Sequence, residues 1–160
     1  PYYAVDQRTG EKVAVVFRDH LISDKVGFTY SGMSGESAAK DFIRRIHNIK
    51  AELKREGATG PHLVTVILDG ENAWEYYRND GKAFLNDLYK YLSDDPQIKT
   101  ITPSAYLKMF PQQPTLQNLW AGSWINHDFS TWIGEPEENE AWNRLGDARK
   151  VLSYYDMLHR

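Results

Sequence analysis

The residues of this sequence best suited to chemistry are the acids that follow an apolar run. Leu63–Leu68 is rich in β-branched and aliphatic residues and leads directly into Asp69-Gly70-Glu71-Asn72. An acid at the end of a buried strand is partly shielded from water, and desolvation raises the pKa of a carboxyl, which suits a general acid. Two other interpretations remain open. Asp-Gly is also a turn sequence in which Asp69 or Asn72 caps the next segment, and Asp69 with Glu71 could bind a divalent metal, although no third ligand is evident.

A second polar group follows an earlier apolar run. Arg18-Asp19-His20 comes directly after Val13–Phe17. These three residues could form an ion pair and a histidine that only fix a loop, because charges at strand ends are common. They could equally position a neighbouring carboxylate or bind a substrate hydroxyl.

Tryptophans mark the long irregular stretch from Pro111 to Gly134. A loop of that length in a compact domain is usually functional or disordered, and its tryptophans argue against disorder. Flat indole faces beside amide and carboxylate groups resemble a surface on which sugar rings stack, whereas the alternative is simple packing onto helices. The residues concerned are Trp120, Trp124 and Trp132 with Asn126, His127, Asp128 and Asn139.

Composition excludes several classes of protein. The chain has 160 residues, a formal net charge of -3 and no cysteine. Its charge argues against a nucleic-acid partner, and the lack of cysteine excludes disulfides, iron–sulfur clusters and thiolate zinc sites. No histidine pair has metal-ligand spacing and no nucleotide-binding motif is present, so we expect neither a metal nor another cofactor. No apolar run is long enough to span a membrane, and the absence of a leader favours the cytoplasm.

Hydrophobic periodicity predicts three strands and four helices. The strands are Val13–Phe17, Leu63–Leu68 and Ile98–Ile101. The first helix carries its apolar stripe from Ala39 to Leu53 and ends at Gly57. Three further helices are predicted from their starts: one capped by Asp80, one capped by Thr102 with Pro103 in the first turn, and one opened by Pro136 with an apolar face that includes Trp142.

The order of these elements predicts an α/β fold, a parallel βαβαβα segment that ends in a long helix. Three buried parallel strands need further strands beside them, so we expect either a partner chain or a larger domain to complete the sheet. Residues 1–160 are therefore expected to be a single domain or a fragment of a larger one, and the start at Pro1 without a Met favours an excised piece. The strand ends and the tryptophan loop should then gather on one rim.

Three stretches in order resemble glycoside hydrolase family 57, closest to its amylopullulanase-like branch. This family of retaining α-glucan enzymes includes α-amylases and 4-α-glucanotransferases, and its catalytic domain is a (β/α)7 barrel followed by a helical region. The resemblance implies that this chain supplies the last strands of an incomplete (β/α)7 barrel. The stretches that carry it are Phe17–Phe28, Val66–Glu75 and Gly122–Pro136.

The resemblance also implies roles for individual residues. Asp69 falls on the general acid/base position, while the nucleophile glutamate of the family lies upstream of the region seen here. The isolated chain is therefore expected to be inactive, with an α-glucan or oligosaccharide and the rest of the catalytic domain as its partners. The alternative is a non-catalytic carbohydrate-binding or scaffold piece that uses its tryptophans. The residues expected to bind substrate are Arg18, Asp19, His20, Glu71, Trp124 and Trp132.

Overall fold

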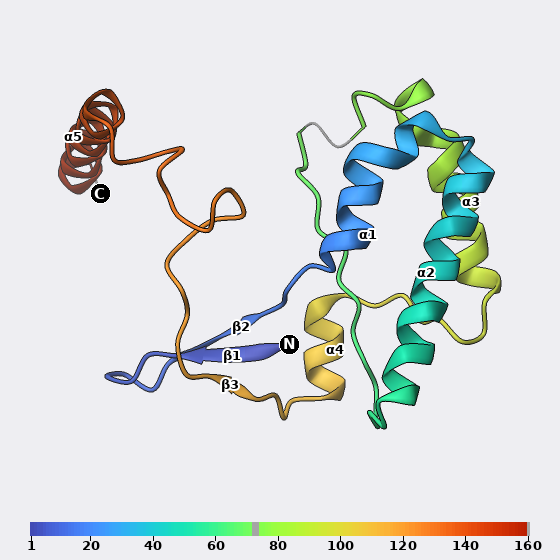
Figure 1. Ribbon diagram of the computed structural model, residues 1–160. Coiled ribbons are helices and arrows are strands. Elements are labelled where there is room, and N and C mark those ends of the chain that lie inside the picture. The colour runs from blue at the N-terminus through green and yellow to red at the C-terminus, as the bar shows by residue number, and fades with distance from the viewer. Residues whose placement is uncertain (72–73, 160) are drawn as a thin grey trace. The chain divides into compact units, whose positions relative to one another are not determined.

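The computed structural model describes residues 1–71 and 74–159. The chain divides into two compact units, Pro1–Gln117 and Asn118–Arg160. The first unit combines a small sheet with a group of helices, and the second consists of an irregular stretch and one long helix (Figure 1). The mixed α/β content expected from the sequence is therefore present.

The sheet lies at the N-terminus of the first unit and has the strand order β2-β1-β3. Strands β1 (Tyr2–Val5) and β2 (Lys12–Val15) form an antiparallel hairpin in which Tyr2 is opposite Val15. Strand β3 (Thr115–Leu116) lies near the C-terminal end of the first unit in sequence and pairs with β1 in parallel. The predicted strand Val13–Phe17 is confirmed only in part, because β2 ends at Val15.

The parallel βαβαβα order expected from the sequence is not what the structure shows. Leu63–Leu68 and Ile98–Ile101 form no strand, and in the described part of the chain the one parallel pair is β1 with β3. An apolar run rich in β-branched residues predicts that a segment is extended and buried. A strand also needs a neighbouring backbone whose N–H and C=O groups are free to form hydrogen bonds with it. Among the described residues, residues 63–68 form one backbone hydrogen bond with another segment, from the Asp19 N–H to the Thr65 carbonyl, and one bond does not make a strand pair.

A helical segment that the sequence did not predict follows the hairpin. It begins as α1 (His20–Asp24), continues as the π-helix η1 (Lys25–Thr29) and ends as the 3-10 helix η2 (Tyr30–Gly32). Its buried residues recur every three or four positions, which is the pattern of a helix with one face on a core. These residues are Ile22, Ser23, Val26 and Tyr30.

The first predicted helix is confirmed as α2 (Gly35–Arg55). The Ser34 hydroxyl accepts a hydrogen bond from the Ser37 backbone N–H at 3.2 Å and so caps its N-terminus. Gly57, just beyond its end, has φ of 75°, the left-handed conformation in which glycine commonly ends a helix.

The next two predicted helices are also present, with one difference in capping. Helix α3 (Lys82–Asp94) follows the short 3-10 helix η3 (Arg78–Gly81). The N-cap of α3 is Gly81 and not Asp80, so the expected cap is wrong: Asp80 has φ of 53° and lies inside η3, where its side chain is too early in the chain to cap α3. Helix α4 (Pro103–Met109) has the expected N-cap, Thr102.

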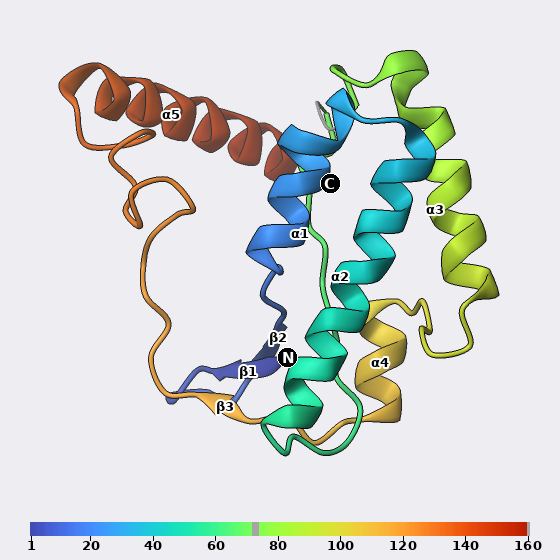
Figure 2. The same cartoon turned by 45° about the vertical axis from the view of Figure 1, so that its right-hand side comes forward.

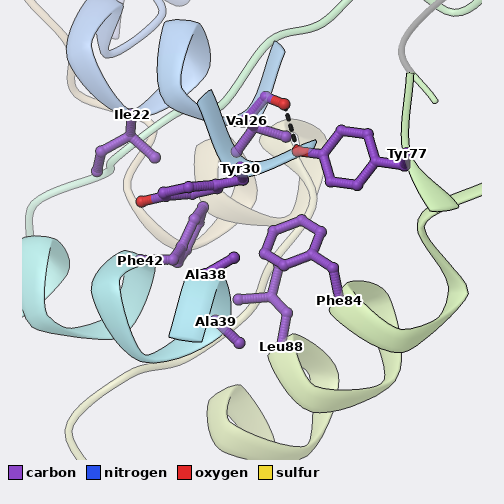
Figure 3. Packing of buried hydrophobic residues seen from close by; sticks show 9 residues of the cluster. All are labelled: Ile22, Val26, Tyr30, Ala38, Ala39, Phe42, Tyr77, Phe84 and Leu88. Atoms are coloured by element: carbon purple, nitrogen blue, oxygen red, sulfur yellow. Dashed lines mark hydrogen bonds between the residues drawn. The ribbon is translucent and has the colours of Figure 1, made fainter. Parts of the chain in front are cut away.

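The core of the first unit lies where the helical segment after β2 meets α2 and α3, as Figure 3 shows. The Tyr77 hydroxyl donates a hydrogen bond to the Val26 carbonyl inside this cluster, and burial raises the pKa of Tyr77 to about 12. Helices α2 and α3 approach so closely that a methyl group on Gly35 would lie 2.7 Å from the Phe84 backbone nitrogen. The cluster consists of Ile22, Val26, Tyr30, Ala38, Ala39, Phe42, Tyr77, Phe84 and Leu88.

The second unit ends in α5 (Pro136–Leu158), which confirms the last predicted helix. A capping box formed by Glu135 and Glu138 fixes its start. No described residue of α5 is buried, so the apolar face expected to pack is exposed in this structure, and Trp142 is half exposed. Periodicity shows that a helix has an apolar side, but it does not show which surface covers that side.

Candidate functional site

The segment Leu63–Leu68 runs extended along α1 and leads to Asp69. The Asp19 N–H donates to the Thr65 carbonyl at 2.7 Å, and the Ile67 N–H donates to the Ser23 hydroxyl at 3.2 Å. In both views the segment passes beside α1 (Figures 1 and 2). The segment is therefore hydrogen-bonded to Asp19, the last residue before α1, and to the side chain of Ser23 within α1.

The two faces of this segment differ. Val64, Val66 and Leu68 pack against the core cluster, whereas Ile67 is exposed. Side chains of an extended chain alternate between two faces, so Asp69 falls on the face that points away from the core. The sequence predicted a strand buried on both faces, and this structure buries one.

Asp69 and Glu71 are both exposed, and Gly70 and Glu71 lie in a turn. Among the described residues the Asp69 carboxylate forms no hydrogen bond or ion pair. The turn interpretation agrees with the backbone at Gly70 and Glu71, and the capping interpretation involves residues 72 and 73, which include the alternative cap Asn72 and lie outside the described residues.

The polar group before and within α1 is built around Asp24. One carboxylate oxygen of Asp24 lies 3.0 Å from an Arg18 guanidinium nitrogen, and the other lies 3.1 Å from Nε2 of His20. The His20 side chain is 78% exposed, while Arg18 and Asp24 are about one-third exposed. The sequence suggested an ion pair within Arg18-Asp19-His20, whereas in the structure the partner of Arg18 is Asp24.

Asp19 has a structural task in this arrangement. Its carboxylate accepts a hydrogen bond from the Ile22 N–H at 2.8 Å and so caps α1. Its half-buried side chain and its backbone bond to Thr65 fix the start of α1 against the extended segment. Asp19 thus fixes the start of α1, with Arg18 directly before it and His20 directly after it in the chain.

The residues that follow the third predicted strand, Ile98–Ile101, do not lie near Asp69. The Tyr106 hydroxyl of α4 donates to the Pro61 carbonyl at 3.1 Å, which places α4 at the beginning of the extended segment and Asp69 at the other end. Both views show this separation (Figures 1 and 2). Thr102 and Ser104, at the start of α4, belong to a helix cap and not to a rim shared with Asp69.

The tryptophan segment belongs to the second unit and is held by its own hydrogen bonds. Trp124 is 65% exposed and Trp132 is 40% exposed. The Trp120 indole N–H donates to the His127 carbonyl at 2.9 Å, and the Trp142 indole N–H donates to the Trp132 carbonyl at 2.8 Å. The side chains of Trp124 and Trp132 therefore keep an exposed surface, and a role in sugar binding stays a prediction.

Two of the polar side chains that were expected to bind sugar beside these tryptophans, Asp128 and Asn139, form hydrogen bonds within the loop itself. The Asp128 carboxylate accepts from the N–H and the hydroxyl of Ser130, which lowers the pKa of Asp128. The Asn139 amide donates to the Gly134 carbonyl and accepts from the Gly134 N–H. Both side chains stabilise the loop before α5.

Asp24 and Ser23 are the residues that sequence reasoning missed. The signal was the spacing: Asp24 is four residues after His20 and Ser23 is four residues after Asp19, so each pair shares a helix face. The sequence analysis predicts no helix here, and a spacing of four residues brings side chains together only in a helix.

Two other kinds of site are absent from the described residues. Across residues 1–71 and 74–159, no three side chains of His, Cys, Asp or Glu gather closely enough to hold a metal ion. In the same residues no helix has both the length and the apolar character needed to cross a lipid bilayer.

Comparison with known proteins identifies the family of the chain. The family model described as Glycosyl hydrolase family 57 matches residues 1–117, which include α1, the extended segment and Asp69. No curated protein matches the chain. The match spans the whole first unit, and it agrees with the family that the three sequence motifs resemble. The chain belongs to glycosyl hydrolase family 57.

Proposed function

We propose that this chain contributes the general acid/base of a retaining glycoside hydrolase that acts on α-glucans, and that Asp69 is this residue. The observation that carries the proposal is the position of Asp69 on the outward face, directly after an extended segment that is hydrogen-bonded to the α1 region. The family match includes this segment, and a glycosyl hydrolase family implies a carbohydrate substrate.

The proposed chemistry has two steps. The Asp69 carboxylic acid protonates the glycosidic oxygen as the bond to the sugar breaks, and a glutamate takes the sugar as a covalent glycosyl ester. The Asp69 carboxylate then removes a proton from water, which releases the sugar with its original configuration. The glutamate is expected to lie outside this sequence. Glu71 is too close to Asp69 along the chain to serve as the partner.

The barrel is part of the same proposal. Residues 13–17, 63–68 and 98–101 would be strands of a (β/α)7 barrel whose other strands lie outside these 160 residues. The alternation of Leu63–Leu68, with one face on the core and one face open, suits a barrel strand that still lacks its neighbours. The rest of the domain and the bound glycan would exclude water around Asp69.

Substitution of Asp69 in the protein expressed with its complete catalytic domain tests the proposal. Asp69→Asn should lower turnover of amylose by about 10²- to 10⁴-fold, the usual contribution of a general acid/base. An aryl glucoside with an acidic phenol should remain a substrate for the first step, because its leaving group needs no proton. Added azide should then restore product release as a glycosyl azide of retained configuration, because azide needs no base.

Two variants serve as controls. Glu71→Gln removes the neighbouring carboxylate, and Asp94→Asn removes an exposed aspartate at the end of α3. Asp94→Asn should keep wild-type turnover, and neither control should respond to azide. Near-wild-type turnover of Asp69→Asn, or azide rescue of Glu71→Gln in its place, would show that Asp69 is not the acid/base.

A second candidate function is sugar binding by the tryptophan segment, favoured by the exposed indole faces of Trp124 and Trp132. Titration of maltooligosaccharides into the 160-residue chain should then give measurable heat. Trp124→Ala and Trp132→Ala should each lose it, while Tyr154→Ala, which removes an exposed aromatic ring of α5, should not. Absence of binding by the unsubstituted chain would remove this candidate and leave the acid/base proposal untouched.

A further inference from the structure

The residues around Trp124 form a closed loop within the second unit, the Trp120–His127 loop. The Trp120 indole N–H donates to the His127 carbonyl at 2.9 Å and so joins the two ends of this loop. Inside it, the Ser123 hydroxyl donates to the Ile125 carbonyl at 2.9 Å and accepts from the Ile125 N–H at 3.1 Å. These two bonds link the residue before Trp124 to the residue after it, so the backbone is held on both sides of Trp124.

A tight turn sets the position of the His127 carbonyl. Asn126 and His127 have φ of 52° and 60°, and the Asp128 N–H donates to the Ile125 carbonyl at 3.3 Å. Two successive residues with positive φ at the centre of a four-residue turn are the pattern of a type I′ turn. The acceptor of the Trp120 hydrogen bond therefore belongs to a defined turn.

Gly122 leaves the space that the closure of the loop needs. A methyl group on Gly122 would overlap the His127 carbonyl oxygen, and it would lie 2.9 Å from the His127 carbonyl carbon and 3.0 Å from Cδ1 of Trp120. The same oxygen accepts the Trp120 hydrogen bond. Any side chain at position 122 would therefore displace the donor or the acceptor of this bond.

The closed loop keeps the Trp124 ring accessible. Trp124 is 65% exposed, whereas its neighbours Ser123 and Ile125 are half-buried. A side chain that is already held in its binding orientation loses less conformational entropy when a ligand binds. The Asn126 side chain is also exposed, and among the described residues it forms no hydrogen bond. An exposed indole and a free amide in one short loop suit a sugar ring, which has an apolar face and hydroxyl groups.

We propose that Trp120 and Gly122 are positioning residues that hold the Trp124 ring ready to stack on a glucosyl unit. The Trp120 indole N–H closes the loop at the His127 carbonyl, and Gly122 leaves room for that carbonyl. The inference rests on the proposed function of the tryptophan segment as a sugar-binding site, and it says how that site is preformed.

Titration of maltoheptaose into the 160-residue chain tests the proposal. Trp120→Phe keeps an aromatic ring but loses the N–H, and it should weaken binding about threefold to tenfold, the effect of one hydrogen bond. Gly122→Ala should weaken binding at least as much, because the methyl displaces the acceptor of the same bond. The double variant should bind no more weakly than Gly122→Ala alone, because both substitutions break one contact.

Two variants of α5 are the matched controls. Gly146→Ala adds a methyl group that meets no atom within 4 Å, and Tyr154→Phe changes an exposed aromatic ring. Both should bind maltoheptaose as tightly as the unsubstituted chain. Losses that add in the Trp120→Phe, Gly122→Ala double variant would show that Trp120 contacts the sugar directly, and this would overturn the positioning role.

Nitrogen-15 relaxation measures the positioning of Trp124 without any sugar. The Trp124 backbone N–H should have an order parameter of about 0.85 in the unsubstituted chain, the value of rigid backbone, and below about 0.6 in Trp120→Phe and in Gly122→Ala. Helical circular dichroism should stay the same in both variants, which separates a loosened loop from a loss of fold. Unchanged order parameters would overturn the inference.

The sugar-binding function is read independently. Binding that is lost in Trp124→Ala but unchanged in Trp120→Phe and Gly122→Ala would support the function and overturn the positioning role. No heat from the unsubstituted chain would remove the sugar-binding function, and the inference would fail with it.

Discussion

At the scale of single residues, the first unit has two aspartates that each gather several partners. Asp24 bridges Arg18 and His20 at an exposed surface, whereas Asp41 accepts hydrogen bonds from Tyr30 at 2.9 Å and from Arg45 at 2.7 Å beside the core. The difference is burial: the Tyr30 side chain is almost fully buried, so its hydroxyl depends on Asp41 for a partner. Asp41 is therefore expected to contribute to the stability of the first unit.

Asp41 gives a prediction with a defined pH dependence. Burial acts to raise its pKa, but the hydrogen bonds from Arg45, Tyr30 and Arg44 outweigh burial and lower the pKa to about 2. A carboxyl with a depressed pKa in the folded state stabilises the fold above its ordinary pKa and loses this effect as the pH falls through the folded value. Asp41→Asn should thus cost about 1–2 kcal/mol of unfolding free energy at pH 7.

Urea unfolding as a function of pH measures this effect. The stability difference between wild type and Asp41→Asn should shrink between about pH 4 and pH 2, as the wild-type carboxylate becomes protonated. Glu52→Gln, which removes an exposed partner of Arg55, should differ little from wild type at any pH. A stability difference that is constant down to pH 2 would show that the Asp41 charge is not responsible.

At the scale of elements, the close packing of α2 on α3 determines the first unit. Both helices contribute to the core cluster, and the His47 imidazole of α2 pairs with the Asp95 carboxylate just beyond α3 at 2.6 Å. At Gly35 of α2 any side chain would meet the backbone of α3. A glycine at this position therefore allows the two helices to pack as closely as they do.

Gly35→Ala should destabilise the first unit by about 1–3 kcal/mol, the usual cost of overpacking. The added methyl would lie 2.7 Å from both the Ala83 carbonyl carbon and the Phe84 nitrogen, and backbone atoms cannot move aside as a flexible side chain would. Gly32→Ala is the matched control, because a methyl there meets no atom within 4 Å. Thermal unfolding of the two variants should differ clearly, and equal midpoints would contradict this account.

At the scale of the whole chain, burial is concentrated in one of the two units. Every buried hydrophobic residue of the described chain lies between Ile22 and Tyr106, whereas α5 has none. The family match ends at residue 117, where the first unit also ends. The catalytic proposal for Asp69 and the stability of the fold therefore both concern Pro1–Gln117.

A chain that ends at Gln117 should keep the stability of the 160-residue chain. We expect its thermal midpoint to change by less than about 4 °C, the shift that about 1 kcal/mol gives in a domain of this size. A chain that ends at Ile101 is the control, because it loses α4 with the buried Tyr106 and should melt at a clearly lower temperature. A large drop on removal of residues 118–160 would show that the second unit contributes to the core.

The amino-acid sequence was enough to predict four of the helices and the family. Local signals sufficed for α2, α4 and α5, because an apolar stripe that stops at Gly57, a Thr102-Pro103 start and a Pro136 start each depend on residues close together in the chain. The three motifs were equally local, and the family match confirms the family that they resemble. Asp69 as acid/base was predicted from that resemblance and remains a prediction.

The contacts between distant segments follow from the folded structure and not from local sequence. The run Leu63–Leu68 is extended as its sequence predicts, but its hydrogen bonds with Asp19 and Ser23 join it to the α1 region instead of to a strand. Asp24 became visible as a partner of Arg18 and His20 only once residues 20–24 formed a helix. Periodicity predicts which side of a helix or strand is apolar. Which segment packs against that side depends on the backbone groups and apolar surfaces that folding places next to it, and these come from distant parts of the sequence.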